Sequence, residues 1–476
     1  MDWISKGFLI LLVILVTYLY NLSQKVPDLP EFEDTWWGVG KEQYNEESDI
    51  TPFKISLNDK DLHKQLSSYK ITQSLDGTNH EYGINTNLLE DIIEHWHKDY
   101  NWTQRKKYLN KFPQFTVKVQ GLKIHFIRLS PKIDPTRPPP SVLPLMLLHG
   151  WPSSVREFYD VIPLLNQHKP GVNFVFDIIV PSLPNSGFSD ATRKPGLGLI
   201  EHSVLLKNFM LKLGFPKFYV HGGDWGAAIA QTIATLYPDH LFGIHSTRCL
   251  VNRYSDFKIM MFSLVPSLII AKEKTHKLYP VLDKVKFLLS NFGYLHMQAH
   301  KPDAIGVALN DSPVGLAAYI LDKFIESSDV MLKDGGLKNS YKFDALIDNL
   351  MIYWVTGKIT NSMRIFAETF NKRNFDYQLD LIPTEVPTAC TRFTQDIFYY
   401  PETILMDKFF KLVHINDLDV GHFPGYENPE LLAQEIWKAI NRIEEVLRVE
   451  EIYHVHLLKK ITWLGPSDRE HWLAEK

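Results

Sequence analysis

An aspartate lies at the centre of the run Gly222-Gly223-Asp224-Trp225-Gly226, which follows a short apolar segment and precedes an amphipathic one. Small residues two positions before and two positions after a central residue permit the sharp strand-to-helix turn called a nucleophile elbow. A carboxylate at such a turn is a candidate nucleophile. The alternative is a glycine-rich turn whose aspartate caps the next helix, and the pentapeptide alone does not separate the two.

The loop His149-Gly150-Trp151-Pro152 carries groups that this nucleophile needs. It follows an apolar run, so a backbone N–H just after the strand end can point at the elbow and help to form an oxyanion hole. We expect the N–H groups of Trp151 and Trp225 to form this hole, and the Trp151–Pro152 bond is a candidate cis peptide. Taken by itself, the tetrapeptide is only a turn with a proline.

A nucleophile elbow is followed along the chain by an acid and then by a histidine. His422 lies in a loop between a strand-like run and the final helical stretch, so we assign it as the base. Asp396 follows another strand-like run, where the orienting acid belongs, and Asp417 and Asp419 remain competitors for that role. The order of elbow, oxyanion loop, acid and base favours a catalytic interpretation over a set of unrelated loop residues.

The elements that must hold these residues alternate between short apolar runs and amphipathic stretches. Such runs are typical of buried parallel strands, and the stretches between them are typical of connecting helices. The expected strands are Leu143–Leu148, Phe174–Val180, Lys217–His221, Val386–Phe393 and Leu412–Asp417. The expected helices are Ile200–Leu213, Ala227–Tyr237 and Pro429–Leu447. The pattern predicts a doubly wound α/β sheet that a mostly helical segment interrupts over about residues 251–374.

The segment that precedes this core has a different pattern. Phe115–Ile127 alternates like a strand, Leu88–Trp96 is amphipathic, and the proline-rich run Pro135–Pro140 marks a stiff boundary. We therefore expect an anchor at residues 1–25, an amino-terminal domain at 26–140, a core in two pieces at 141–250 and 381–447, a helical lid at 251–380, and an extension of unknown role at 448–476.

The first 25 residues predict a single-pass membrane anchor. The 18 residues from Gly7 to Gln24 carry no charge and would span roughly 27 Å as a helix, close to the thickness of an endoplasmic-reticulum bilayer. A cleaved signal peptide is the alternative, but the residues after Tyr20 offer no convincing small-residue cleavage site. The flanking charges of Asp2, Lys6 and Lys25 determine the orientation only weakly.

Composition argues against several other classes of protein. The net charge of −4 disfavours a nucleic-acid partner, and 45% hydrophobic residues in 476 suit a folded chain with a large core. The two cysteines, Cys249 and Cys390, cannot make a disulfide framework and lack the spacing of a structural zinc site. Histidines two residues apart near residues 95 and 454 fit no metal motif.

Taken together, the motifs resemble the microsomal epoxide hydrolases, a branch of the α/β-hydrolase superfamily that includes the juvenile hormone epoxide hydrolases of insects. The resemblance runs from about residue 30 to residue 443, and Ser153–Tyr159 leans toward the insect type. The motifs that carry it are Asp34–Gly38 (DTWWG), His149–Pro152 (HGWP), Gly222–Gly226, Ala308–Lys323 and Gly421–Glu435. It implies an α/β-hydrolase fold with a helical lid, a wrapping amino-terminal domain behind a membrane anchor, and an endoplasmic-reticulum location with the catalytic domain in the cytosol.

The resemblance also implies a reaction. An epoxide carbon has no carbonyl for a nucleophile to add to, so it must be opened by displacement, and a carboxylate can do this and leave an alkyl ester. Asp224 would be the nucleophile, and His422, held by Asp396, would deprotonate the water that hydrolyses the ester. The substrate would be a lipophilic epoxide, either like juvenile hormone or xenobiotic, and no metal or organic cofactor would be required.

In this family two lid tyrosines donate hydrogen bonds to the oxirane oxygen. Tyr294 matches the first, but Phe366, which has no hydroxyl, stands where the family has the second. Tyr353 and Tyr377 are candidate substitutes. Two other functions therefore stay open: a weakly active or inactive ligand-binding homologue, and a haloalkane dehalogenase-like hydrolase, which would need halide-binding N–H donors in place of Tyr294.

Overall fold

The structure is a computed structural model of the 476-residue chain. It describes residues 25–41, 49–59, 61–133, 139–326, 337–394 and 398–463, together with Ile14, Thr17 and Tyr18, and it describes side chains only as far as Tyr453. The expected anchor at residues 1–25 therefore lies almost entirely outside the described residues. Among the residues that are described, no helix combines the length and the apolar character needed to cross a membrane.

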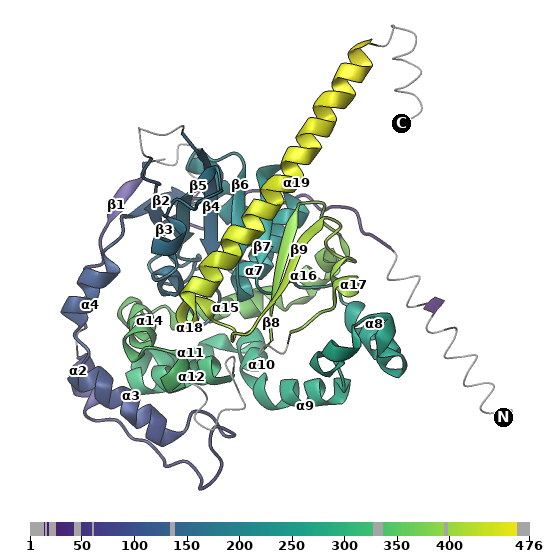
Figure 1. The fold of residues 1–476 in the computed structure, drawn as a ribbon. Coiled ribbons are helices and arrows are strands. Elements are labelled where there is room, and N and C mark those ends of the chain that lie inside the picture. Colours follow the sequence, from purple (N-terminus) through teal and green to yellow (C-terminus); the bar gives the residue numbers. More distant parts are fainter. Residues whose placement is uncertain are drawn as a thin grey trace, which may run out of the picture.

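A mixed β-sheet forms the centre of the molecule (Figure 1). Within the described ranges it has nine strands, in the order β1-β2-β3-β5-β4-β6-β7-β8-β9. The strands are β1 Thr51–Phe53, β2 Gln114–Val119, β3 Leu122–Leu129, β4 Ser141–Leu148, β5 Phe174–Pro181, β6 Phe218–Gly222, β7 Leu241–Ser246, β8 Thr388–Phe393 and β9 Leu412–Leu418. Neighbours from β5 to β9 pair in parallel, whereas β1, β2 and β3 form an antiparallel edge. The predicted α/β sheet is thus confirmed.

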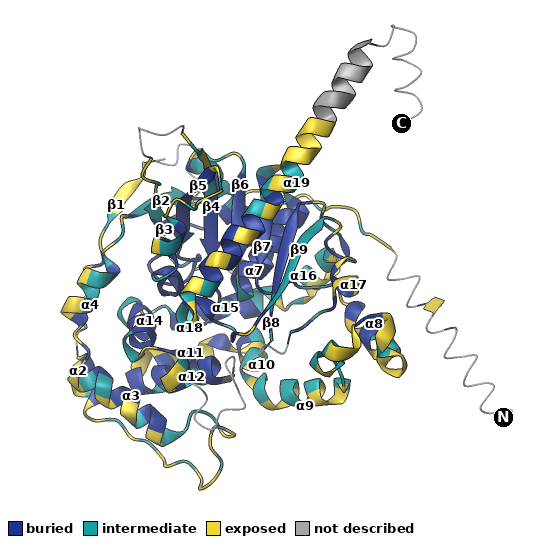
Figure 2. Ribbon diagram, viewed as in Figure 1, coloured by how far each residue is buried: buried dark blue, intermediate teal, exposed yellow. Residues whose placement is uncertain are grey.

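Helices cover both faces of this sheet. They are α5 Ile162–Leu165, α6 Leu199–Lys212, α7 Asp224–Leu236 and α19 Pro429–Trp463. Successive side chains of a strand point to opposite faces. Accordingly, Leu145 and Leu147 of β4 join a buried cluster with α5 and α19, and Met146 and Leu148 join another with α6 and α7. Figure 2 shows the central strands β5, β6, β7 and β8 and helix α7 as the buried centre of the fold.

The chain between β7 and β8 forms the predicted helical lid. Its helices are α8 Ser255–Met261, α9 Val281–Asn291, α10 Gly293–His300, α11 Pro302–Asp311, α12 Pro313–Glu326, α13 Leu337–Ser340, α14 Phe343–Thr356, α15 Ile359–Thr369 and α16 Lys372–Tyr377. The amino-terminal helices α2 Leu62–Leu66, α3 Thr86–Lys98 and α4 Trp102–Leu109 run past the edge of the sheet toward α12 and α14 (Figure 1). Short elements complete the chain: α17 Glu402–Leu405, α18 Pro424–Glu427, and the 3-10 turns η1 Val155–Phe158, η2 Pro238–His240, η3 Phe262–Leu264, η4 Pro266–Leu268, η5 Lys272–Lys277 and η6 Leu379–Leu381.

The expected single strand at Phe115–Ile127 is instead a hairpin. Gln120 and Gly121 have positive φ values of 49° and 83°, which reverse the chain between β2 and β3. Two consecutive residues with positive φ are typical of the tight turn that joins antiparallel strands. The alternation of apolar and polar residues continues through this turn, so the sequence pattern does not mark the boundary between the two strands.

Two further features extend beyond the sequence prediction. Cys249 and Cys390, which were not expected to pair, form a disulfide with a Cα–Cα distance of 5.9 Å. This bond joins the segment after β7 to the middle of β8. Helix α19 does not end near Leu447 but continues to Trp463, and its far end projects away from the body (Figures 1 and 2).

A buried carboxylate joins the amino-terminal helices, the core and the lid. Asp348 on α14 has no exposed side-chain surface and accepts hydrogen bonds from Arg105 Nε, Arg156 Nε and the Tyr100 hydroxyl, each at 2.9 Å. A buried carboxylate without partners is costly, so these three donors hold their elements together.

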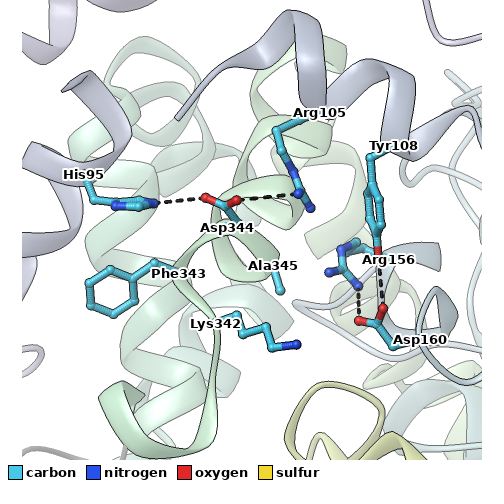
Figure 3. Close-up of a pocket in the computed structure, with 9 residues that line it drawn as sticks. All are labelled: His95, Arg105, Tyr108, Arg156, Asp160, Lys342, Phe343, Asp344 and Ala345. Atoms are coloured by element: carbon cyan, nitrogen blue, oxygen red, sulfur yellow. Dashed lines mark hydrogen bonds and ion pairs between the residues drawn. The ribbon is translucent and has the colours of Figure 1, made fainter. Parts of the chain in front are cut away.

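A cavity of about 410 Å³ lies beside this junction (Figure 3). Around it, Arg105 also reaches Asp344 at 3.5 Å, and Arg156 reaches Asp160 at 3.1 Å. Because both arginines are already paired with carboxylates, we interpret this cavity as part of the interdomain packing.

Replacing Asp348 by alanine should lower the free energy of unfolding by about 3–5 kcal/mol, because it removes the buried acceptor that Arg105 Nε, Arg156 Nε and the Tyr100 hydroxyl share. The matched control is Asp303→Ala, whose carboxylate is 63% exposed and pairs with Arg364. That change should cost less than about 1 kcal/mol. Urea denaturation followed by tryptophan fluorescence measures both, and equal losses would contradict the proposed junction.

Candidate active site

The turn after β6 holds Asp224 in an unusual backbone conformation. Its φ is 46°, in the left-handed region that residues with a side chain seldom occupy. A Cβ on Gly222 would lie 2.3 Å from the Gly226 carbonyl oxygen, and one on Gly226 would lie 2.1 Å from the Leu148 carbonyl oxygen. Both glycines are therefore required by the close packing of β4, β6 and α7. This turn is the elbow that the pentapeptide predicts.

The loop after β4 approaches one oxygen of this carboxylate. The Trp151 N–H donates a hydrogen bond to Asp224 Oδ1 at 3.0 Å, and the Trp151–Pro152 bond is cis, as expected. A Cβ on Gly150 would lie only 2.4 Å from Asp224 Cβ, so the approach depends on glycine. Within the described chain no hydrogen bond joins the Trp225 N–H to this carboxyl, so Trp225 as a second donor stays a prediction.

The other oxygen of the carboxylate faces two basic side chains. Asp224 Oδ2 lies 2.6 Å from Arg248 Nη1 and 3.4 Å from His422 Nε2. Burial by itself would raise the pKa of Asp224, but the hydrogen bond to His422, the positive charge of Arg248 and the Trp151 N–H together lower it to about 2. The carboxylate is therefore ionised at neutral pH, as a nucleophile must be.

Glu427 holds the loop that carries His422. Its carboxylate accepts the N–H of Gly421 at 2.7 Å and the N–H of Phe423 at 3.0 Å, so the backbone is held at the residue before and the residue after the histidine. The Tyr341 hydroxyl of the lid donates to the same carboxylate at 2.7 Å. Sequence reasoning missed Glu427; its only signal is an acid a few residues after the loop histidine.

Aromatic side chains from the lid pack against Trp151 and Trp225, the two tryptophans next to the nucleophile. Tyr294 on α10 stacks on Trp151, with ring centroids 5.7 Å apart and planes at 16°. Phe366 on α15 is 3% exposed and contacts Trp151 at 5.5 Å, Trp225 at 4.8 Å and Tyr294 at 6.3 Å between centroids. An apolar wall of this kind suits a lipophilic ligand.

Known proteins are similar to this chain in sequence and in fold. A family model described as "Epoxide hydrolase N terminus" matches residues 50–158, and one described as "alpha/beta hydrolase fold" matches residues 144–248. Juvenile hormone epoxide hydrolase 1 of Ctenocephalides felis is 43% identical over 90% of this chain and 93% of its own length. Epoxide hydrolase 1 of Oryctolagus cuniculus is 37% identical over 90% of this chain and 97% of its own length. The crystal structure of juvenile hormone epoxide hydrolase from Bombyx mori matches with a TM-score of 0.84 and 40% identity, over 88% of this chain and all of that one.

The chain is an epoxide hydrolase of the microsomal family. The α/β-hydrolase fold and the resemblance drawn from the motifs are thereby confirmed.

The sequence predicts that an acid orients His422 in this epoxide hydrolase. Asp396, the residue that the sequence predicts, lies outside the described residues. Of its two competitors, Asp417 is bound by Arg392 and Lys274, each at 2.6 Å, and Asp419 accepts the Thr394 hydroxyl at 2.6 Å. Asp396 therefore stays the prediction.

The two tyrosines named as substitutes for the missing hydroxyl are engaged elsewhere. The Tyr353 hydroxyl donates to the Ser153 carbonyl oxygen at 2.9 Å. Tyr377 packs against Phe32, with ring centroids 4.9 Å apart, at the outer end of α16. Neither contact favours a role in donating to the substrate of the epoxide hydrolase. Among the described residues, no group of three histidines, cysteines or acids is placed to hold a metal ion.

Proposed function

We propose that this enzyme converts lipophilic epoxides to vicinal diols through a covalent ester on Asp224. The observation that supports this most is that the two carboxylate oxygens have different neighbours. Oδ1 accepts the Trp151 N–H, while Oδ2 lies 3.4 Å from His422 Nε2. In the first step Oδ2 attacks an epoxide carbon, the ring carbon–oxygen bond breaks, and the oxygen takes a proton from the Tyr294 hydroxyl.

The second step hydrolyses the ester. His422 takes a proton from water, and the hydroxide adds to Cγ of Asp224 while negative charge develops on Oδ1. The Trp151 N–H already contacts this oxygen, so its hydrogen bond stabilises the tetrahedral intermediate. Collapse breaks the bond between Cγ and Oδ2, and Oδ2 takes the proton from His422 and leaves with the diol. The second proton of the water returns to the Tyr294 oxygen, and the carboxylate is restored with one oxygen from water.

The substrate that we propose is an apolar epoxide of the size class of an insect juvenile hormone, with xenobiotic epoxides as the alternative. The aromatic wall of Trp151, Trp225, Tyr294 and Phe366 supports a lipophilic substrate. Relatives that are named for juvenile hormone are 40–43% identical to this chain, whereas a mammalian epoxide hydrolase 1 is 37% identical.

The location that we propose is the endoplasmic-reticulum membrane, with residues 1–25 as the anchor and the catalytic domain in the cytosol. This rests on the sequence alone, namely on 18 uncharged residues before Lys25. The full chain should stay with membranes after an alkaline wash, and a chain that begins at Val26 should be washed off. Release of the full chain by the wash would contradict an anchor.

Replacing His422 by glutamine should stop the second step and trap the ester. After brief exposure to a lipophilic epoxide, the peptide that contains Asp224 should gain the mass of one epoxide, as measured by mass spectrometry. The Asp224→Asn variant is the control and should gain none. A diol product without any adduct on the His422 variant would contradict the ester mechanism.

Replacing Phe366 by tyrosine should restore a donor beside Tyr294, because the ring already packs against Tyr294 and against Trp225, the residue after the nucleophile. One hydrogen bond to a developing charge is worth about 1–3 kcal/mol, so the rate of ester formation should rise about ten- to a hundredfold. Rapid-mixing tryptophan fluorescence measures this rate. No gain would refute a role for the missing hydroxyl and would leave Tyr294 as the sufficient donor.

A further inference from the structure

Arg248 makes the shortest polar contact to the nucleophile. Its Nη1 lies 2.6 Å from Asp224 Oδ2, nearer than His422 Nε2 at 3.4 Å. The guanidinium carbon lies 4.0 Å from the centre of the Phe398 ring, so the group is held between an aromatic face and the carboxylate. Arg248 belongs to none of the sequence motifs described above.

The backbone of Arg248 is fixed by hydrogen bonds at the end of β7. Its N–H donates to Ser246 Oγ at 3.2 Å, and its carbonyl oxygen accepts from Gln231 Nε2 of α7 at 2.8 Å. Within the described chain, Asp224 is the carboxylate that binds this side chain, and the buried Nε has no hydrogen-bond partner. Among the described residues, the Arg248 side chain therefore forms an ion pair with the nucleophile and is not part of a larger ion-pair network.

Arg248 contacts Oδ2, the reacting oxygen of Asp224. Oδ1 accepts the Trp151 N–H, so Oδ2 is the atom that attacks the epoxide and becomes the bridging oxygen of the ester. During attack Oδ2 loses negative charge, and the hydrogen bond from Arg248 weakens. During collapse of the tetrahedral intermediate Oδ2 gains negative charge as its bond to Cγ breaks, and the hydrogen bond strengthens.

We propose that Arg248 is a catalytic residue of ester hydrolysis, which donates a hydrogen bond to the departing diol oxygen and, through the same contact, restrains attack in the first step. This role rests on the proposed ester mechanism. The electron pair of the breaking Cγ–Oδ2 bond goes to Oδ2, the proton comes from the His422 imidazolium that formed when water was deprotonated, and Arg248 keeps its own proton.

Arg248 does not replace the hydroxyl that Phe366 lacks. In a displacement the leaving oxygen departs from the side of the carbon opposite to the attacking oxygen, and Arg248 sits on the attacking oxygen. The enzyme therefore has one phenolic donor for ring opening, Tyr294, at a position where the family also has tyrosine. Arg248 is an additional, cationic donor for release of the diol. This division predicts opposite effects on the two steps when Arg248 is changed.

The test is to measure ester formation and ester hydrolysis separately in Arg248→Met and Arg248→Lys, in single-turnover reactions with a lipophilic epoxide. For Arg248→Met we expect ester formation at least as fast as in the unchanged enzyme and hydrolysis slower by about ten- to a hundredfold. Lysine, which keeps a donor with a charge, should recover part of the loss. The matched control is Arg253→Met, which breaks an arginine–aspartate pair with Asp380 outside the site and should change neither rate.

A second measurement separates a catalytic role from a structural one. With an epoxide that carries a fluorinated substituent, the departing oxygen is less basic and needs less stabilisation, so the loss in Arg248→Met should shrink. Equal slowing of both steps, unchanged hydrolysis, or a loss that does not depend on the substituent would each overturn the role of Arg248. If the unchanged enzyme gives diol without an ester, the proposed mechanism itself fails, and that result is distinguishable because it does not involve the variants.

Discussion

The backbone of Asp224 is held at φ 46°, and the rest of the site depends on this conformation. For a residue with a side chain this backbone conformation carries strain of order 1–3 kcal/mol. It persists only where the surrounding structure enforces it. Here the surroundings are β4 and α7, which approach so closely that glycine is required at positions 150, 222 and 226. The turn presents two oxygens to different neighbours, one to a backbone N–H and one to two basic side chains.

The lid shapes the space over this carboxylate through aromatic contacts. Trp225 follows the nucleophile in the chain, Trp151 donates its N–H to the nucleophile, and Tyr294 and Phe366 of the lid pack on these two tryptophans. The lid is in turn tied to the core by Asp348 and by the bond between Tyr341 and Glu427. The same lid therefore contributes aromatic side chains beside the nucleophile and a hydrogen bond to the carboxylate that holds the histidine loop.

The sequence was informative where the determinants are local. The spacing of glycines around Asp224 predicted the elbow, because the steric demand of that turn falls on residues two positions away. The position of His422 followed from chain order in a sheet of predictable topology. By contrast, the hairpin at Gln120 was missed because the apolar alternation runs through it.

Arg248 could not have been predicted from its own neighbourhood. It reaches the nucleophile because β6 and β7 pair in parallel with Gly222 opposite Ser246, which brings residues two positions further along each strand together. Such register is set by the whole sheet and leaves no local pattern. The sequence alone shows that phenylalanine stands at position 366 where the family has tyrosine. That its ring packs against Trp225 follows only from the course of α15 in the structure.

The disulfide between Cys249 and Cys390 has a topological consequence. Its ends lie 141 residues apart, one where the chain leaves the sheet after β7 and the other in β8, where the chain has returned. All helices from α8 to α16 lie within the covalent ring that it closes. A protease that cut one peptide bond in this ring would leave a two-chain molecule in which both pieces stay attached to the sheet.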